Sequence, residues 1–215
     1  MEKTVQYIKA DFHVHTSFSR RVTVSPEEMY AAAREKGLGK IAVTDHNTLE
    51  GACRLAEMDP DFIIVGEEIT WKAPGEIIGL FMKEAIPEGR SAAYTLDALH
   101  EQNAFIFIPH PFAPFHFFSP PGNILKMADR IDGVEIRNGR NFHTFNFCAG
   151  AFSFLSNIQG ICGSDAHTQN NVGRAGMILP DFSTADELRK SIKLAKPFGS
   201  GQSLISSLKL LKKVF

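Results

Sequence analysis

Short apolar runs alternate with amphipathic stretches along most of this chain. Such runs are typical of buried strands, and we predict strands at residues 7–15, 40–45, 62–68, 77–81, 105–109, 133–137, 158–163 and 176–179. Helical periodicity predicts helices at residues 25–37, 48–58, 96–103, 123–130, 144–155 and 184–196. Strands that alternate with helices indicate an α/β fold with parallel strand pairing. About seven repeats of this unit favour a barrel over an open sheet.

Two segments stand outside this alternation. Residues 109–122 are rich in Pro and Phe and predict a non-helical loop, which can line a pocket or cover it. Residues 204–215 interleave Leu, Ile and Phe with three lysines and predict a terminal helix near 203–214. We favour packing of this helix on the barrel over a role at a membrane surface or against a partner.

The composition fits one domain over residues 1–215. The chain has 44% hydrophobic and 22% charged residues, which is ordinary for a soluble globular protein. Its net charge of −1 gives no global field that would recruit nucleic acid, although a local basic patch remains compatible with it. Three cysteines without a CxxC pair argue against a disulfide framework or a Cys-based zinc site.

The same sequence indicates where the protein resides and argues against one class of fold. We expect a cytoplasmic protein without membrane association, because the N-terminus lacks the apolar core of a signal peptide and no apolar run is long enough to span a membrane. No GxGxxG motif follows the first predicted strand, which argues against a dinucleotide-binding fold.

Histidines and carboxylates gather where the predicted strands end. Since the carboxyl ends of barrel strands converge on one face, residues far apart in sequence would meet there. These residues are His13 and His15, Asp45 and His46, Glu67 and Glu68, His110, Glu135, and Asp165 and His167. Buried charges need partners, so such a set at five strand ends is difficult to explain by packing alone.

Alternate residues of a strand point to the same side, so His13 and His15 can face one point, and so can Asp165 and His167. Imidazole and carboxylate groups are ligands for Zn, Mn or Fe. The set exceeds the needs of one tetrahedral ion and indicates a cluster of two or three divalent metals. Some members have other interpretations: Asp45 can orient its neighbour, Glu67 can point away from Glu68, and Glu135 can support a ligand from outside.

These segments resemble the PHP family, the polymerase and histidinol phosphatase domain. The resemblance rests on DFHVHTSFS, AVTDHNT, VGEEIT, GEIIGLF, IPHPF, VEIRNGR and GSDAHT, which occur in the family's order. It implies a distorted (β/α)7 TIM-like barrel that holds up to three metals at its C-terminal face. It further implies that His13, His15, Glu68 and Asp165 hold one metal, that Glu68 and His110 hold a second, and that His46 and His167 hold a third.

The sequence departs from the family pattern at two positions. Arg20 stands where many members have an aspartate ligand of the third metal, so this site is expected to be weak or empty, with Arg20 as a phosphate anchor. Glu76 stands where some members have a histidine ligand of the second metal, and a carboxylate favours harder metals such as Mn.

The predicted activity is hydrolysis of a small phosphorylated substrate by a metal-bound hydroxide. Arg20, Arg137 and Arg140 are candidates for binding the phosphoryl oxygens, and Asp165 or His167 for protonating the leaving oxygen. One alternative is an exonuclease-like activity on nucleic-acid ends, for which Lys72 and Arg21 add positive charge. The other is a non-catalytic metal-binding module with a regulatory role.

Overall fold

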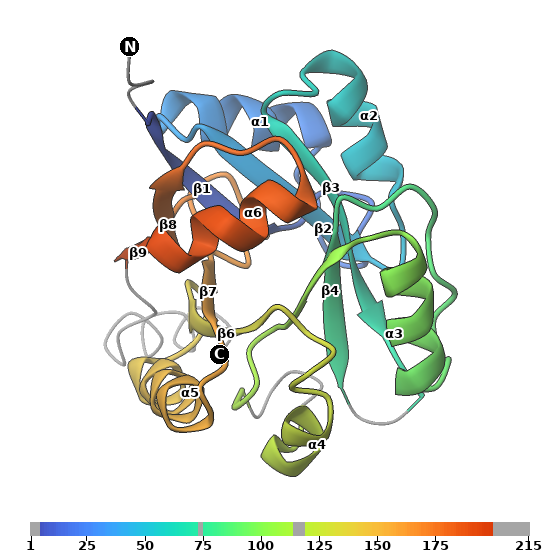
Figure 1. The fold of residues 1–215 in the computed structure, drawn as a ribbon. Helices are drawn as coiled ribbons and strands as arrows, with labels where there is room; N and C mark the ends of the chain where they lie inside the picture. Colours follow the sequence, from blue (N-terminus) through green and yellow to red (C-terminus); the bar gives the residue numbers. More distant parts are fainter. Residues whose placement is uncertain (1–4, 73–74, 114–118, 200–215) are drawn as a thin grey trace, which may run out of the picture.

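The chain forms a nearly closed barrel in a computed structural model that describes residues 5–72, 75–113 and 119–199 (Figure 1). The described strands make one sheet in the order β7-β6-β5-β4-β3-β2-β1-β8-β9. Their bounds are β1 Tyr7–Val14, β2 Lys40–His46, β3 Ile63–Thr70, β4 Glu76–Leu80, β5 Phe105–Ile108, β6 Gly133–Asn138, β7 Gly160–Gly163, β8 Ala175–Pro180 and β9 Lys196–Gly199. The predicted α/β barrel is confirmed.

The helices cover the sheet from outside, except for α6. Their bounds are α1 Pro26–Glu35, α2 Glu50–Met58, α3 Ala92–Glu101, α4 Pro121–Lys126, α5 His143–Ser156 and α6 Ala185–Ser191, which a 3-10 turn, Ile192–Leu194, extends. Helix α1 starts as its sequence predicts: the Ser25 hydroxyl accepts from the Glu28 amide, and the Glu28 carboxylate accepts from the Ser25 amide. No described helix has the length and apolar character needed to cross a membrane.

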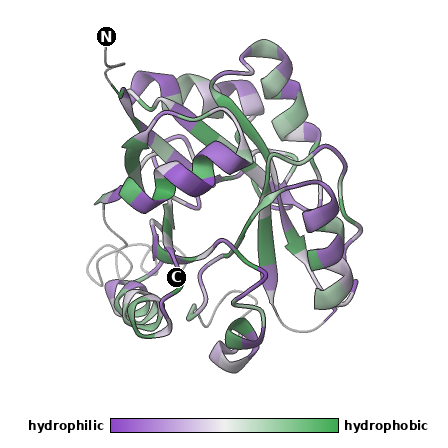
Figure 2. Ribbon diagram, in the orientation of Figure 1, coloured by the Kyte–Doolittle hydropathy of each residue, from purple (hydrophilic) through white to green (hydrophobic). Residues whose placement is uncertain are grey.

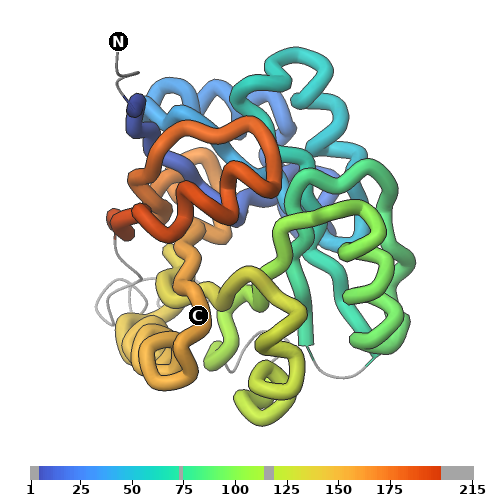
Figure 3. Tube along the Cα trace, in the orientation of Figure 1, coloured from blue at the N-terminus to red at the C-terminus, as the bar shows by residue number. Residues whose placement is uncertain are grey.

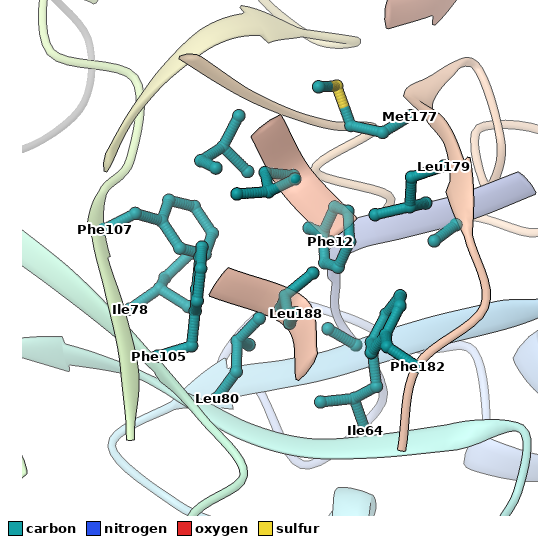
Figure 4. Close-up of a cluster of buried hydrophobic side chains, with 14 of the residues drawn as sticks. Phe12, Ile64, Ile78, Leu80, Phe105, Phe107, Met177, Leu179, Phe182 and Leu188 are labelled. Atoms are coloured by element: carbon teal, nitrogen blue, oxygen red, sulfur yellow. The ribbon is translucent and has the colours of Figure 1, made fainter. Parts of the chain in front are cut away.

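The barrel interior is apolar away from the site. Alternate strand residues, among them Phe12, Ile78, Phe105 and Phe107, form a buried cluster that Leu188 of α6 joins (Figure 4). Two further clusters pack α1 and α2 against β1–β3, and α3 and α4 against β4–β6. In Figure 2 the strands are mostly apolar, whereas the helices carry both apolar and polar residues.

The prediction of parallel strand pairing was partly wrong. β4 pairs antiparallel with β3 and β5, and β8 pairs antiparallel with β1 and β9. A parallel crossover needs a dozen or more residues, usually with a helix, whereas only residues 71–75 join β3 to β4. β8 returns along β1, which places an early and a late segment side by side (Figure 3).

Several element bounds also differ from those predicted. Helix α6 ends at Ser191, and the residues from Lys196 to Gly199, predicted as helix or not assigned, form the edge strand β9. The pattern of β9 is mostly exposed, so it carries no apolar signal. The helix predicted over residues 123–130 is α4, which begins at Pro121, inside the predicted loop over residues 109–122, and ends at Lys126. The predicted helix near 203–214 lies outside the described residues.

β1 and the loop after β7 close the barrel through Asp11 and Ala166. The amide of His15 donates to the Ala166 carbonyl at 2.9 Å. The buried Asp11 carboxylate accepts from the amides of His13 at 3.3 Å, Ser164 at 2.8 Å and Gly173 at 2.8 Å. One side chain therefore joins β1 to the loop that follows β7.

We expect Asp11→Ala to lower the free energy of unfolding by at least about 3 kcal/mol, because it leaves three buried amides without an acceptor. Asp11→Asn keeps one acceptor oxygen and should lose less. Urea unfolding measures both variants, with the exposed Asp129→Ala as control, for which we expect a change within about 0.5 kcal/mol. A loss equal to that of the control would contradict the role of Asp11 in closing the barrel.

Candidate metal centre

All eight residues predicted as metal ligands lie at one end of the barrel. The parallel strands β1, β2, β3, β5 and β7 bring their carboxyl ends there, and the reversed strand β4 brings its first residue, Glu76. Four sets of three donor atoms lie within 4.8 Å of one another: His15, His46 and His167; His13, His15 and Glu68; His13, His110 and Asp165; and His46, Glu68 and Glu76.

His13 and His15 face the same point, as strand alternation predicts. Their Nε2 atoms lie 3.0 Å apart, and both side chains are buried. The register of β1 on β2 shifts between Asp11 and Val14. Phe12 already faces the barrel interior, so this irregularity allows His13 to turn inward as well.

Glu68 lies at the middle of the cluster. Its Oε2 is 3.3 Å from His13 Nε2, 3.2 Å from His15 Nε2 and 3.2 Å from His46 Nδ1, and its Oε1 is 3.0 Å from His110 Nε2. This one carboxylate therefore contacts imidazoles that come from three different parts of the barrel.

Glu76 lies beside the same histidines at longer range. Its oxygens are 3.7 Å from His46 Nδ1 and 3.8 Å from His110 Nε2. Glu67, the residue before Glu68 in β3, points away from the cluster, and its carboxylate accepts a hydrogen bond from the amide of Ile86 at 3.0 Å. Strand alternation therefore separates Glu67 from the cluster.

Glu135 and Asn138 hold the cluster from outside. Glu135 Oε1 lies 3.2 Å from His13 Nδ1, and Glu135 Oε2 accepts from the His110 amide at 2.8 Å. The Asn138 amide group donates to Glu135 at 3.0 Å and to Asp165 Oδ2 at 3.2 Å. Glu135 was considered as a supporting residue from the sequence, but nothing in the spacing marked Asn138.

Asp45 supports His15 through Ser19. The Ser19 hydroxyl donates to Asp45 at 2.7 Å, so it accepts from His15 Nδ1 at 3.0 Å and from the His46 amide at 3.0 Å. Asp45 also accepts from the amide and hydroxyl of Thr16, both at 2.6 Å. The sequence raised an orienting role for Asp45, whereas a serine in a loop gave no signal.

Removing the Ser19 hydroxyl should weaken metal binding without removing a donor atom. We expect Ser19→Ala to lower metal affinity about 10- to 100-fold, the range known for such supporting residues. Ser17→Ala changes an exposed serine two residues away and should leave the affinity unchanged. Titration with Zn²⁺ and Mn²⁺ measures both, and equal affinities would show that His15 needs no help from Ser19.

Asp165, His167 and Arg140 form the other edge of the cluster. Asp165 Oδ1 lies 3.4 Å from His15 Nε2, 3.3 Å from His167 Nδ1 and 3.2 Å from Arg140 Nη1. The same Arg140 nitrogen is 3.1 and 3.0 Å from the two ring nitrogens of His167. Asp165 and His167 follow β7 in a loop, so strand alternation, which was invoked for this pair, was the wrong reason for their convergence.

Backbone strain marks two members of the cluster. His110 has a φ of 28° and Asp165 a φ of 52°, in the left-handed region that residues other than glycine rarely adopt. Such conformations persist only where surrounding contacts enforce them, and they gather at functional sites. Here the Glu135 carboxylate holds the amide of His110.

Two of the predicted phosphate anchors lie apart from the cluster. Arg20 is exposed, and Arg137 donates to the carbonyl of Gly199 at 2.8 Å. The remaining histidines were not among the predicted ligands: His100 and His143 are exposed on helices, and His116 lies outside the described residues. Of the predicted phosphate anchors, only Arg140 contacts the cluster in the part of the chain that the structure describes.

The buried charges of the cluster shift each other's pKa values. Burial disfavours a charged His13, but Glu68, Glu135 and Asp165 outweigh it and hold its pKa well above the usual range. Burial acts likewise on His15, whose hydrogen bonds to Asp165 and Glu68 raise its pKa to about 9. A bound cation must displace these protons, so metal affinity should rise with pH up to about 9.

At the edge of the cluster the pKa values of the histidines are lowered instead of raised. Burial, followed by the positive charge of His15, lowers the pKa of His167 to about 3. Burial also lowers the pKa of His46. Burial and the negative charge of Glu68 raise the pKa of Glu76 to about 8. His46 and His167 are therefore neutral at pH 7, and the neutral imidazole is the form that binds a metal.

The donor set fits divalent cations. With Nδ1 of His13 facing Glu135 and Nδ1 of His15 facing Ser19, both Nε2 atoms point inward at the carboxylates of Glu68 and Asp165. Protons on these Nε2 atoms balance the carboxylates in the free protein, and a divalent cation would take their place between the neutral imidazoles and the carboxylates. Nitrogen and oxygen donors together suit Zn, Mn or Fe.

Two family models and a curated relative match this chain. The model of the PHP domain matches residues 11–101, and the PHP-associated model matches residues 143–197. An uncharacterized protein of Methanocaldococcus jannaschii is 33% identical over 149 residues, which covers 61% of this chain and 82% of the relative.

Two solved structures share the fold. A two-domain protein from Bacteroides vulgatus, described as containing a predicted PHP-like metal-dependent phosphoesterase, has a TM-score of 0.73 at 22% identity over 91% of this chain. This chain spans 65% of that protein's length. The lesion-specific endonuclease from Pyrococcus furiosus has a TM-score of 0.66 at 18% identity, covering 89% of this chain and 58% of its own.

Proposed function

Because this chain belongs to the PHP family, we propose that it is a metal-dependent hydrolase of phosphoesters, a phosphatase or phosphodiesterase that acts on a small substrate. The observation that carries this proposal is the arrangement around Glu68. Nitrogens of four histidines lie within 3.3 Å of its two oxygens, and Asp165 and Glu76 add further carboxylates.

The residues divide between two cation positions. His13, His15 and Asp165 would hold one cation, His110 and Glu76 would hold the second, and Glu68 would serve both. Divalent metals bound there supply water of lowered pKa near neutral pH and positive charge for the phosphoryl oxygens. The donor set leaves Zn, Mn and Fe as candidates.

Arg140 would bind the substrate phosphate. Its guanidinium reaches the cluster at Asp165 and His167, and its side chain is 31% exposed, so it can meet both the site and a ligand. A guanidinium binds phosphate oxygens bidentately, which orients the phosphorus as well as neutralising charge. Arg20 and Arg137 would act at most on more distant parts of the substrate.

Proton transfer would involve His167 more than Asp165. Both oxygens of Asp165 are engaged, by Asn138 on one side and by Arg140 and His15 on the other. The His167 side chain is 21% exposed, and its lowered pKa keeps it neutral at pH 7. It would therefore serve as a proton acceptor, whereas the sequence also allowed it as the acid for the leaving oxygen.

A nuclease acting on strand ends is the second candidate. It is supported by the likeness in fold to the endonuclease and by exposed Arg20, Arg21 and Lys72, which follow β1 and β3 on the side of the cluster. The net charge of −1 weighs against a large nucleic-acid surface. A small substrate remains the better supported proposal.

Metal analysis combined with a substrate panel tests these proposals. The purified protein is loaded with Zn²⁺, Mn²⁺ or Fe²⁺ and assayed on phosphomonoesters, small phosphodiesters and short oligonucleotides. Turnover of the small esters supports the first proposal, and turnover of oligonucleotides alone supports the second. Stoichiometric metal without turnover of any substrate would favour a regulatory metal-binding module and overturn both.

We also propose a single domain over residues 1–215 and a cytoplasmic location. The described barrel uses segments from both ends of the chain, since β1 pairs with β2 and β8. The three cysteines are free, as is usual in reducing compartments.

A further inference from the structure

Helix α5 presents an apolar face to solvent. Phe147, Phe154 and Leu155 are 77%, 86% and 82% exposed, and their spacing places them on one side of the helix together with Ala151 and the half-buried Cys148. These five residues are called the α5 face. Of the helix, only Ala149 and Ser153 are buried.

The α5 face differs from the other exposed apolar side chains. Large exposed hydrophobic residues elsewhere in the described segments, such as Met58, Tyr94 and Leu125, occur singly on their helices. Isolated residues of this kind are normal on a surface, whereas a contiguous set marks a binding surface. Figure 2 shows α5 as a largely apolar helix at the periphery of the barrel.

The end of the chain has a matching pattern. Leu204, Leu208, Leu211 and Phe215 recur at intervals of four, three and four, which places them on one side of a helix, while Lys209, Lys212 and Lys213 lie off that line. Such a helix needs an apolar surface to be stable in water. We propose that the C-terminal segment 203–215 packs as an amphipathic helix on the α5 face.

The last described residue is well placed for this contact. The carbonyl of Gly199 accepts from Arg137 of β6, and β6 leads directly into α5. β9 ends on the same side of the molecule as α5 (Figure 1). Residues 200–202 can span about 10 Å. A helix over 203–214 would be about 18 Å long, close to the roughly 21 Å of α5.

The size of the α5 face favours a tethered segment over a second copy. If an aromatic side chain presents about 150–250 Å², three large side chains at these exposures offer roughly 400–500 Å² to a partner. A stable dimer buries about 800 Å² on each subunit. A segment linked by a few residues binds at a high effective concentration and needs less area.

The reactivity of Cys148 tests the proposal. Cys148 lies on the α5 face, and the exposed Cys53 on α2 serves as an internal reference in the same molecule. In the full chain carrying Leu208→Ser and Leu211→Ser, we expect Cys148 to be alkylated about tenfold faster than in the unmodified chain, with Cys53 unchanged. Lys209→Ser with Lys213→Ser, on the other side of the helix, should leave both rates unchanged.

The reciprocal variant is Phe154→Ser, which alters the exposed α5 face and no buried residue. It should make trypsin cut at Lys209 and its neighbours about tenfold faster, whereas Leu125→Ser on α4 should not. An unchanged Cys148 rate in the leucine variant would overturn the proposal. So would protection of Cys148 that appears only in a dimer by light scattering, or only with anionic phospholipid vesicles.

Discussion

A Glu68→Gln variant is expected to lose its bound divalent metal and at least about 10³-fold in phosphoester turnover, which corresponds to about 4 kcal/mol of transition-state stabilisation. Glu68 is the one carboxylate that both proposed cation positions share. Glutamine has nearly the same shape but no negative charge, so the histidines around it would face an amide. The variant therefore removes charge and leaves the packing of β3 in place.

The measurement is metal content per chain alongside kcat on the best ester of the substrate panel. Glu57→Gln, on the exposed side of α2, is the matched control and should keep full metal and activity. Circular dichroism checks that both variants retain the fold. Activity that persists in Glu68→Gln after its metal is lost would show that the cluster does not catalyse the reaction.

The sequence predicts the strands and the gathering of ligands well, for a common physical reason. A buried strand must be apolar, so a histidine or carboxylate at its end stands out against the run before it. His13, Glu68 and His110 are of this kind. Given a barrel, the convergence of strand ends then follows from the topology.

The supporting residues cannot be found in this way. Ser19 and Asn138 are small polar residues in or beside loops, where such residues are common. Their role depends on contacts across the barrel, from Ser19 to Asp45 and from Asn138 to Asp165. No local pattern encodes a contact between residues so far apart in the chain.

Strand direction could be predicted from the sequence for one strand and not for another. The segment from Trp71 to Gly75 is too short for a parallel crossover, so the reversal of β4 was accessible from the sequence. This reversal is what brings Glu76 to the cluster from the start of its strand. The edge strand β9 gave no such signal, because its residues are mostly exposed.

We expect Arg140 to limit the number of cations that the site holds. The donors around the predicted third metal site, His15, His46 and His167, include no carboxylate. Arg140 Nη1 already lies within 3.1 Å of both His167 ring nitrogens. Two unit charges about 4 Å apart repel by about 4 kcal/mol at an effective dielectric constant of about 20. A divalent cation beside Arg140 would meet about twice that, so we expect two metals per chain.

Replacing Arg140 by alanine should therefore have two opposite effects. Metal content should rise from about two towards three ions per chain, because the competing cation is gone. Turnover should fall about 10²- to 10³-fold, because a preorganised charge on the phosphoryl oxygens is lost. Elemental analysis after dialysis gives the first quantity, and steady-state kinetics gives the second.

Arg20→Ala is the informative comparison, because Arg20 stands where the family pattern has the ligand of the third metal. As an exposed residue it should leave the metal count unchanged and should change kcat by no more than about twofold. Arg140→Lys keeps the charge and should keep two metals, but it should recover turnover only in part, because an ammonium cannot bind phosphate bidentately. If Arg20→Ala raises the metal count and Arg140→Ala does not, Arg20 and not Arg140 excludes the third cation.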